Sequence, residues 1–132
     1  DYEIKDSGTH AQYVTGAKRD NSEMKGAFHL LPWESIWHLA MHYEKGAKKY
    51  AERNWEKGIP VARYCEAISR HMIQFQMGMT DENHLVSAYW NIASLYQTLL
   101  WIQRGELPEE LYNMPYKAEI PEPEVIVKAR EG

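Results

Sequence analysis

The sequence predicts an all-α fold, and three observations lead to this prediction. Apolar residues recur at intervals of three and four along three long segments, which is the spacing of one helix face. Glycine and proline separate these segments, with Gly58 and Pro60 after the first and Gly78 after the second. With 132 residues, 44% of them hydrophobic, the chain is long enough to form one domain with its own core. We therefore expect a helical bundle of three main helices with extended arms at both ends.

The predicted bundle occupies residues 32–105, and the segments on either side differ from it in composition. Residues 1–31 are polar and interrupted by glycine, which is typical of an arm or loop. Residues 106–132 contain four of the six prolines and form a Pro-rich C-terminal arm. In that arm we expect a short helix near Glu109–Tyr112 and an extended segment around Val125–Val127.

Each main helix has a predicted start and end. Pro32 suits the first helical position of the first helix, and Pro60 restarts the pattern for the second. Thr80 or Asp81 can cap the third helix, which is expected to continue to about Arg104. The three apolar stripes consist of Ile36, Leu39, Ala40, Tyr43, Ala47 and Tyr50; of Val61, Tyr64, Cys65, Ile68, Met72 and Phe75; and of Leu85, Ala88, Tyr89, Ile92, Tyr96 and Leu99.

The third helix carries two further features besides its apolar stripe. A line of small polar residues runs through it, and buried polar groups need partners, either in other helices or in a bound ligand. Tryptophans and a methionine lie off the stripes of the first and third helices. They either pack beneath the terminal arms or, as we favour, bury surface in a homo-oligomer, a dimer or tetramer. The polar line is Ser87, Asn91, Ser94 and Thr98, and the residues off the stripes are Trp37, Met41, Trp90 and Trp101.

The bulk composition excludes several classes of protein. The net charge of −4 argues against a general nucleic-acid binder, which is usually basic. No apolar run approaches the roughly 20 residues that cross a bilayer, so no membrane partner is expected. Cys65 is the only cysteine and cannot form an internal disulfide. With no signal peptide recognised, we expect a cytoplasmic protein.

Residues 42–55, with the sequence HYEKGAKKYAERNW, are the most informative part of the chain. Cations lie beside aromatic rings and an amide, and this combination suits a nucleotide: charge for the phosphates and a ring face for the base. On the second helix, Arg63 and Arg70 share a face and can each bind phosphate through two nitrogens. The alternative is a solvated Lys-rich helix end, where cations favour the C-terminal dipole. The residues concerned in the segment are Lys45, Lys48, Lys49, Tyr50, Asn54 and Trp55.

Residues for catalysis are harder to recognise. Glu34 and Asp81 are candidates to hold Mg²⁺, although a solvated position near a helix start explains the first and a capping position the second. Cys65 lies on an apolar stripe and is interpreted as core, not as a nucleophile. There is no Gly-rich phosphate loop, and the six histidines do not show the spacing of a zinc site.

Five motifs in order resemble those of a phage domain family, the dATP/dGTP diphosphohydrolases, which is grouped with the MazG-like all-α nucleoside triphosphate pyrophosphohydrolases. The resemblance covers Thr15 to Asn91, more than half of the chain. It implies a helical, oligomeric enzyme that depends on Mg²⁺ or Mn²⁺ and cleaves dATP or dGTP to the monophosphate and pyrophosphate. If the chain is phage-encoded, it would act in the cytoplasm of the host cell. The motifs are TGAKRD (15–20), LLP (30–32), GAKKY followed by NW (46–55), RY followed by SRH (63–71) and HLVSAYWN (84–91).

The resemblance also implies roles for individual residues. Lys18, Arg19, Lys49 and Arg70 would bind phosphates, and Tyr50, Asn54 and Trp55 would bind the base or sugar. His84 and Asn91 match further positions of the nucleotide site. Glu34 and Asp81 would hold the metal and act in catalysis together with His71.

One departure from the family leaves a second function open. MazG-like enzymes usually carry E-x-x-E on one helix and E-x-x-D on the next, and the helices expected here lack that pair. The alternative is therefore a non-catalytic nucleotide-binding protein that sequesters a nucleotide signal of host defence. A third, plainer interpretation is a helical adaptor without nucleotide affinity.

Overall fold

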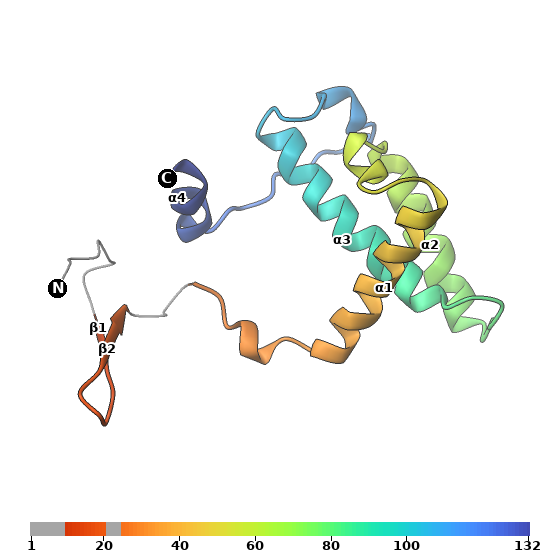
Figure 1. The fold of residues 1–132 in the computed structure, drawn as a ribbon. Coiled ribbons are helices and arrows are strands. Elements are labelled where there is room, and N and C mark those ends of the chain that lie inside the picture. Colours follow the sequence, from red (N-terminus) through yellow and green to blue (C-terminus); the bar gives the residue numbers. More distant parts are fainter. Residues whose placement is uncertain (1–9, 21–24) are drawn as a thin grey trace. The chain divides into compact units, whose positions relative to one another are not determined.

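A computed structural model describes residues 10–20 and 25–132 of the chain, and it confirms the all-α class. Three long helices are the main elements of the structure, and a short fourth helix lies near the C-terminus (Figure 1). Within the described residues, the strands are limited to one antiparallel hairpin that pairs Ala11 with Arg19. No described helix is both long and apolar enough to cross a bilayer. The helices are α1 (Trp33–Lys49), α2 (Val61–Gln76), α3 (His84–Gln103) and α4 (Glu124–Glu131), and the strands are β1 (His10–Gln12) and β2 (Lys18–Asp20).

The chain divides into two compact units. The first consists of residues up to Leu31 together with Glu122–Gly132, and the second is Pro32–Pro121. The first unit contains the hairpin, a 3-10 turn at Phe28–Leu30 and α4. The second contains α1, α2, α3 and a 3-10 turn at Glu109–Leu111, which confirms the short helix expected near Glu109–Tyr112.

The extended segment expected around Val125–Val127 is wrong, because these residues lie in α4. Pro123 precedes the helix, where its fixed φ suits a helix start. Glu124 in the first turn and Lys128 in the last complement the helix dipole, and their side chains form an ion pair of 2.9 Å. These charged residues favour a helix, whereas the apolar residues 125–127 by themselves are typical of a strand.

The segment 42–55 is not one continuous helix, because α1 ends at Lys49. Ala51 and Arg53 both have positive φ, at 153° and 59°, and a 3-10 turn follows at Asn54–Lys57. This turn brings Trp55 against Trp101, with ring centroids 5.5 Å apart and nearly parallel planes. The burial of these two large rings offsets the strain of the turn.

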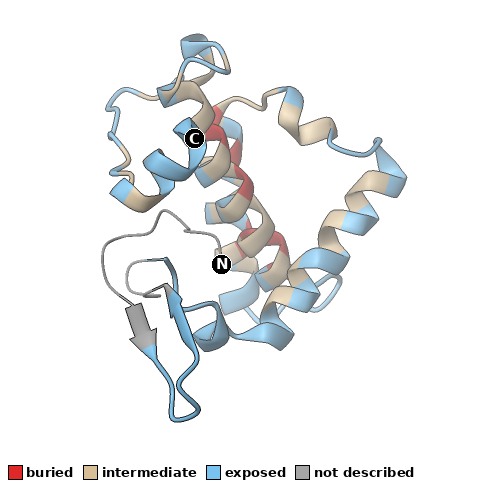
Figure 2. Ribbon diagram, turned by 60° about the vertical axis from the view of Figure 1, so that its left-hand side comes forward, coloured by how far each residue is buried: buried red, intermediate tan, exposed pale blue. Residues whose placement is uncertain are grey.

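The core of the second unit is small and partly polar. Its buried positions lie on α2 and α3 (Figure 2). Ser94 and Tyr43 share a hydrogen bond of 2.7 Å between their hydroxyls, and the Thr98 hydroxyl donates to the Ser94 carbonyl oxygen at 2.8 Å. The polar line of α3 therefore finds its partners in α1 and in its own backbone. The buried residues are Val61, Tyr64 and Ala88 with the polar His71, His84, Ser87, Ser94 and Thr98.

Of the apolar stripe predicted for α3, Ala88 alone is buried in the core of the second unit. Leu85, Ile92 and Tyr96 are 46%, 48% and 50% exposed. The helix instead turns its polar line toward α1 and α2, because small side chains with local hydrogen-bond partners allow close helix packing there. An apolar face of α3 is consequently left at the surface of the chain.

The tryptophans of α3 pack against other aromatic residues of the second unit. The ring of Trp90 lies 6.0 Å from His42, 5.6 Å from Tyr43 and 6.2 Å from Tyr64, measured between centroids. Trp101 stacks on Trp55 as described above. Aromatic pairs at these separations add to the stability gained from buried area alone.

A short connection turns the chain from α2 into α3. Gly78 has a φ of 75°, which ends α2 as predicted. The cap of α3 is Asn83, whose side-chain oxygen accepts from the Val86 amide at 3.0 Å, and not Thr80 or Asp81. The tight connection places the last turns of α2 beside the first turn of α3.

Candidate functional site

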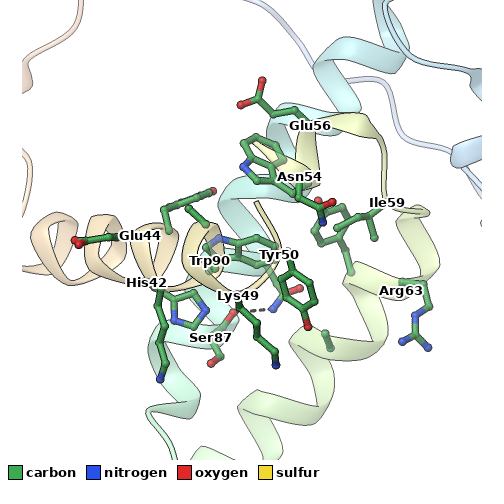
Figure 3. A pocket seen from close by; sticks show the side chains of 18 of the residues that line it. His42, Glu44, Lys49, Tyr50, Asn54, Glu56, Ile59, Arg63, Ser87 and Trp90 are labelled. Atoms are coloured by element: carbon green, nitrogen blue, oxygen red, sulfur yellow. Dashed lines mark hydrogen bonds between the residues drawn. The ribbon is translucent and has the colours of Figure 1, made fainter. Parts of the chain in front are cut away.

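A cavity of about 1000 Å³ lies among the three long helices of the second unit. Its walls are the C-terminal half of α1, the turn after it, one side of α2 and the first half of α3 (Figure 3). This volume is at the upper end of the range for pockets that bind small molecules and cofactors. The cavity is therefore large enough for a nucleoside triphosphate.

Cations from two helices line this cavity. Lys49 and Arg63 form no salt bridge with any described residue, whereas the Arg70 Nε donates to Glu66 Oε1 at 3.0 Å. This hydrogen bond is the main reason why the pKa of Glu66 is lowered. In Figure 3, the side chain of Lys49 extends from the end of α1 toward α2, and that of Glu44 points away. The arrangement leaves positive charge available for an anionic ligand.

Several acids line the same cavity, but most of them are already paired. Glu44 lies 3.5 Å from Lys48, and Glu56 lies 2.6 Å from Arg53. Glu52 makes no salt bridge within the described residues. The lining contains five lysines and arginines and five glutamates, so its formal charges balance; Lys45, Lys49 and Arg63 are the cations of the lining without a salt bridge among the described residues.

Aromatic and amide groups complete the lining. Tyr50 is 65% exposed, with the Lys49 ammonium 5.2 Å from its ring centroid. Trp55 also lines the cavity, although its ring already stacks on Trp101. Asn91 donates to the Ser87 carbonyl at 2.8 Å, which leaves its amide oxygen without a described partner. Tyr50 therefore has the most accessible ring for a base, and Asn91 has a free acceptor.

Two buried histidines meet at one end of the cavity. The Nδ1 atoms of His71 and His84 are 3.0 Å apart, and these residues are only 8% and 2% exposed. Glu82 Oε1 lies 3.7 Å from the first Nδ1 and 3.5 Å from the second. Asp81 Oδ1 is 2.7 Å from the other ring nitrogen of His84, Nε2. We refer to His71, Glu82 and His84 as the histidine cluster.

The surroundings of the histidine cluster favour neutral imidazole at His71. Burial is the largest cause of the lowered pKa of His71, and the neighbouring Arg70 adds to it, while Glu82 opposes it. The hydrogen bond from His84 lowers the pKa of the Asp81 carboxyl. A neutral imidazole has a nitrogen lone pair, and an ionised carboxylate has two acceptor oxygens. In these protonation states, both groups can bind a cation.

Most of the predicted site residues come together in this structure. Seven of them line the cavity, and two more, Asp81 and His84, contact each other at the histidine cluster. Glu34 is exposed in the first turn of α1 and does not line the cavity. Lys18 and Arg19 lie on β2 of the first unit. The seven lining residues are Lys49, Tyr50, Asn54, Trp55, Arg70, His71 and Asn91.

Among the described residues, no three carboxylates converge to form a magnesium site by themselves. Mg²⁺ requires near-ideal octahedral geometry with oxygen ligands. Among the described residues, the one group of three converging ligands is the histidine cluster, which offers two nitrogens and one oxygen. Glu34 does not belong to it, and Asp81 reaches it only through His84. We therefore assign no step to Mg²⁺.

Glu82 is one of the carboxylates near the helical core in the sequence, but it was not among the predicted metal ligands. Its neighbour Asp81 attracted attention as a cap, and the two histidines are separated by 13 residues without a recognisable motif. The tight turn from α2 to α3 and the polar residues at its end were the one feature of the sequence that could have indicated this cluster. Only the packing of these two helices brings the three groups together.

Comparison with known proteins gives one match. The family model described as "dATP/dGTP diphosphohydrolase, N-terminal" matches residues 15–105, which is more than half of the chain. No curated protein and no solved structure matches the chain. The matched region includes all residues that line the cavity.

Proposed function

Since the chain belongs to the dATP/dGTP diphosphohydrolase family, we propose that it binds a purine deoxynucleoside triphosphate in this cavity and cleaves it to the monophosphate and pyrophosphate. One observation carries the proposal: a single cavity of about 1000 Å³ is lined by an exposed aromatic ring, Tyr50, and by the cations Lys49 and Arg63. Cations match the phosphate chain, and the exposed ring of Tyr50 matches a purine.

The reaction would proceed by addition of water to the α-phosphorus. The bond from this phosphorus to the bridging oxygen breaks, and pyrophosphate leaves with the electron pair. Lys49, Arg63 and Arg70 would neutralise the charge that develops on the phosphate oxygens.

The remaining roles come from the family resemblance or from the lining of the cavity. Lys18 and Arg19 remain predicted phosphate ligands, and Glu34 remains a predicted metal ligand, both from the family resemblance. His71 lines the cavity and is the proposed acceptor of the proton from water.

A second function is favoured because the cavity lacks both predicted metal ligands. Neither Glu34 nor Asp81 lines the cavity, whereas the cations Lys49 and Arg70 and the ring of Tyr50 do. A protein that sequesters a nucleotide signal needs only such cations and such a ring. Such a protein would retain its ligand without metal and without turnover.

Incubation with a panel of ribonucleoside and deoxynucleoside triphosphates distinguishes these functions. We expect dATP or dGTP with Mg²⁺ or Mn²⁺ to give the monophosphate and pyrophosphate, separated by anion-exchange chromatography. Stepwise release of single phosphates would contradict the proposed reaction. Tight binding of a nucleotide with no product under any metal would instead establish the sequestering function.

We also propose that the chain forms a homo-oligomer through the exposed apolar face of α3. Leu85, Ile92 and Tyr96 lie on one side of this helix, and each is close to half exposed.

Light scattering after size exclusion tests the oligomer and should give a multiple of 15.5 kDa for the native chain. Ile92→Glu should lower that mass, because it places a charge in the interface. Tyr116→Glu, at a residue that is 89% exposed elsewhere, is the matched control and should leave the mass unchanged. A native mass of 15.5 kDa would contradict the proposal.

A further inference from the structure

We propose that the histidine cluster is a binding site for a zinc-like transition metal, with His71 Nδ1, His84 Nδ1 and Glu82 Oε1 as its three ligands. The site shares His71 with the proposed nucleotide chemistry but is argued from the geometry of the cluster alone. It concerns one end of the cavity, and its test requires no nucleotide.

The distances among the three atoms support a common ion. Two ligands at about 2.0–2.1 Å from a tetrahedral zinc lie about 3.3 Å apart. Here the three separations are 3.0 Å between the two nitrogens and 3.7 and 3.5 Å from Glu82 Oε1 to His71 and His84. The atoms therefore already form one face of a tetrahedron, and a shift of a few tenths of an ångström would complete the site.

Asp81 fixes His84 in the form that a metal requires. Its ionised carboxylate accepts a hydrogen bond from His84 Nε2 at 2.7 Å, so the ring proton lies on Nε2. His84 Nδ1 therefore carries a lone pair, which accepts the 3.0 Å hydrogen bond from His71 Nδ1 when no ion is bound. A carboxylate behind a ligating histidine is the usual arrangement at protein metal sites. Asp81 is thus a positioning residue for the metal rather than a direct ligand.

The donor set selects the kind of metal. Two imidazoles and one carboxylate suit zinc and its neighbours in the first transition row, whereas Mg²⁺ prefers oxygen ligands alone. Three protein ligands also leave one coordination position open. Because His71 and Glu82 both line the cavity, that position would be available to water or to an anionic oxygen of a ligand there.

Metal titration of the full chain tests the site. After chelation and buffer exchange, calorimetry with Zn²⁺ should show one ion per chain, and Mg²⁺ at the same concentration should show no comparable binding. Co²⁺ should give the visible absorption of a tetrahedral site. Glu82→Gln, at a half-exposed side chain, should weaken Zn²⁺ binding at least tenfold, and Asp81→Asn should weaken it about 10- to 100-fold.

Two further variants keep the test informative. His71→Ala should abolish the stoichiometric site, and circular dichroism establishes whether this variant is folded. His38→Ala is the matched control, because His38 is exposed on α1 and lies outside the cluster. The proposal is overturned if Zn²⁺ does not bind, or if Glu82→Gln and Asp81→Asn bind it as tightly as the native chain does. Failure of nucleotide turnover with intact zinc binding would contradict only the proposed reaction.

Discussion

Replacement of both Lys49 and Arg63 by alanine is expected to reduce the affinity for dATP or dGTP by about 100-fold or more. Each residue lines the cavity without a salt-bridge partner among the described residues, so each is free to bind a phosphate oxygen. A hydrogen bond to a charged group contributes about 1.5–3 kcal/mol, and each 1.4 kcal/mol corresponds to about a factor of ten in affinity. Calorimetric titration in the presence of a chelator measures binding without turnover.

The neighbouring Lys48 provides a matched control for this experiment. Lys48 belongs to the same last turn of α1 and therefore interacts with the same helix dipole. Its side chain is 79% exposed, pairs with Glu44 and does not line the cavity. Lys48→Ala should leave nucleotide affinity unchanged within about a factor of two. Equal losses in Lys48→Ala and Lys49→Ala would show that general charge, and not the cavity, attracts the nucleotide.

Replacement of Tyr64 by alanine is expected to destabilise the chain by about 3–5 kcal/mol. Tyr64 is 1% exposed and packs against Trp90, so its removal leaves a cavity at the centre of a small core. A domain of this size has a total stability of about 5–15 kcal/mol, and the loss is therefore a large fraction of it. Urea unfolding followed by tryptophan fluorescence measures the change.

The variant Tyr64→Phe separates the ring of Tyr64 from its hydroxyl. Burial raises the pKa of this hydroxyl to about 12, and the neighbouring Thr98 opposes the shift. The oxygen has no hydrogen bond of acceptable geometry within the described residues. Tyr64→Phe should therefore cost less than about 1 kcal/mol, or stabilise the chain, because it removes a buried polar atom without a partner. A loss as large as that of Tyr64→Ala would show that the hydroxyl is bonded in solution.

The helical segments were predictable because their signals are local. Apolar spacing located the three long helices, and Gly78 marked the end of α2. The faces of the helices were less predictable. In α3, apolar residues occur on several sides, and the sequence alone favoured Leu85 and Ile92 as core over Ser87 and Ser94. The structure buries the two serines, because Tyr43 of α1 supplies a hydrogen-bond partner for Ser94.

Some of the residues that line the cavity were also predictable, because they lie close together in the sequence. Lys49, Tyr50, Asn54 and Trp55 are close in sequence, so that a turn of the backbone keeps them together. The position of their turn was not evident, because the positive φ of Ala51 and Arg53 follows from the contact of Trp55 with Trp101, nearly 50 residues away. A residue in a left-handed conformation is held there by tertiary contacts and leaves no mark of its own in the sequence.

By itself, the sequence determined the helical class, the family and the cation-rich segment, since each depends on residue types at short spacing. Only the tertiary structure decided that His71, Glu82 and His84 form one cluster and that α3 turns its polar side inward. Both outcomes depend on how α2 and α3 pack, and helix packing is set by the summed contacts of residues far apart in the chain.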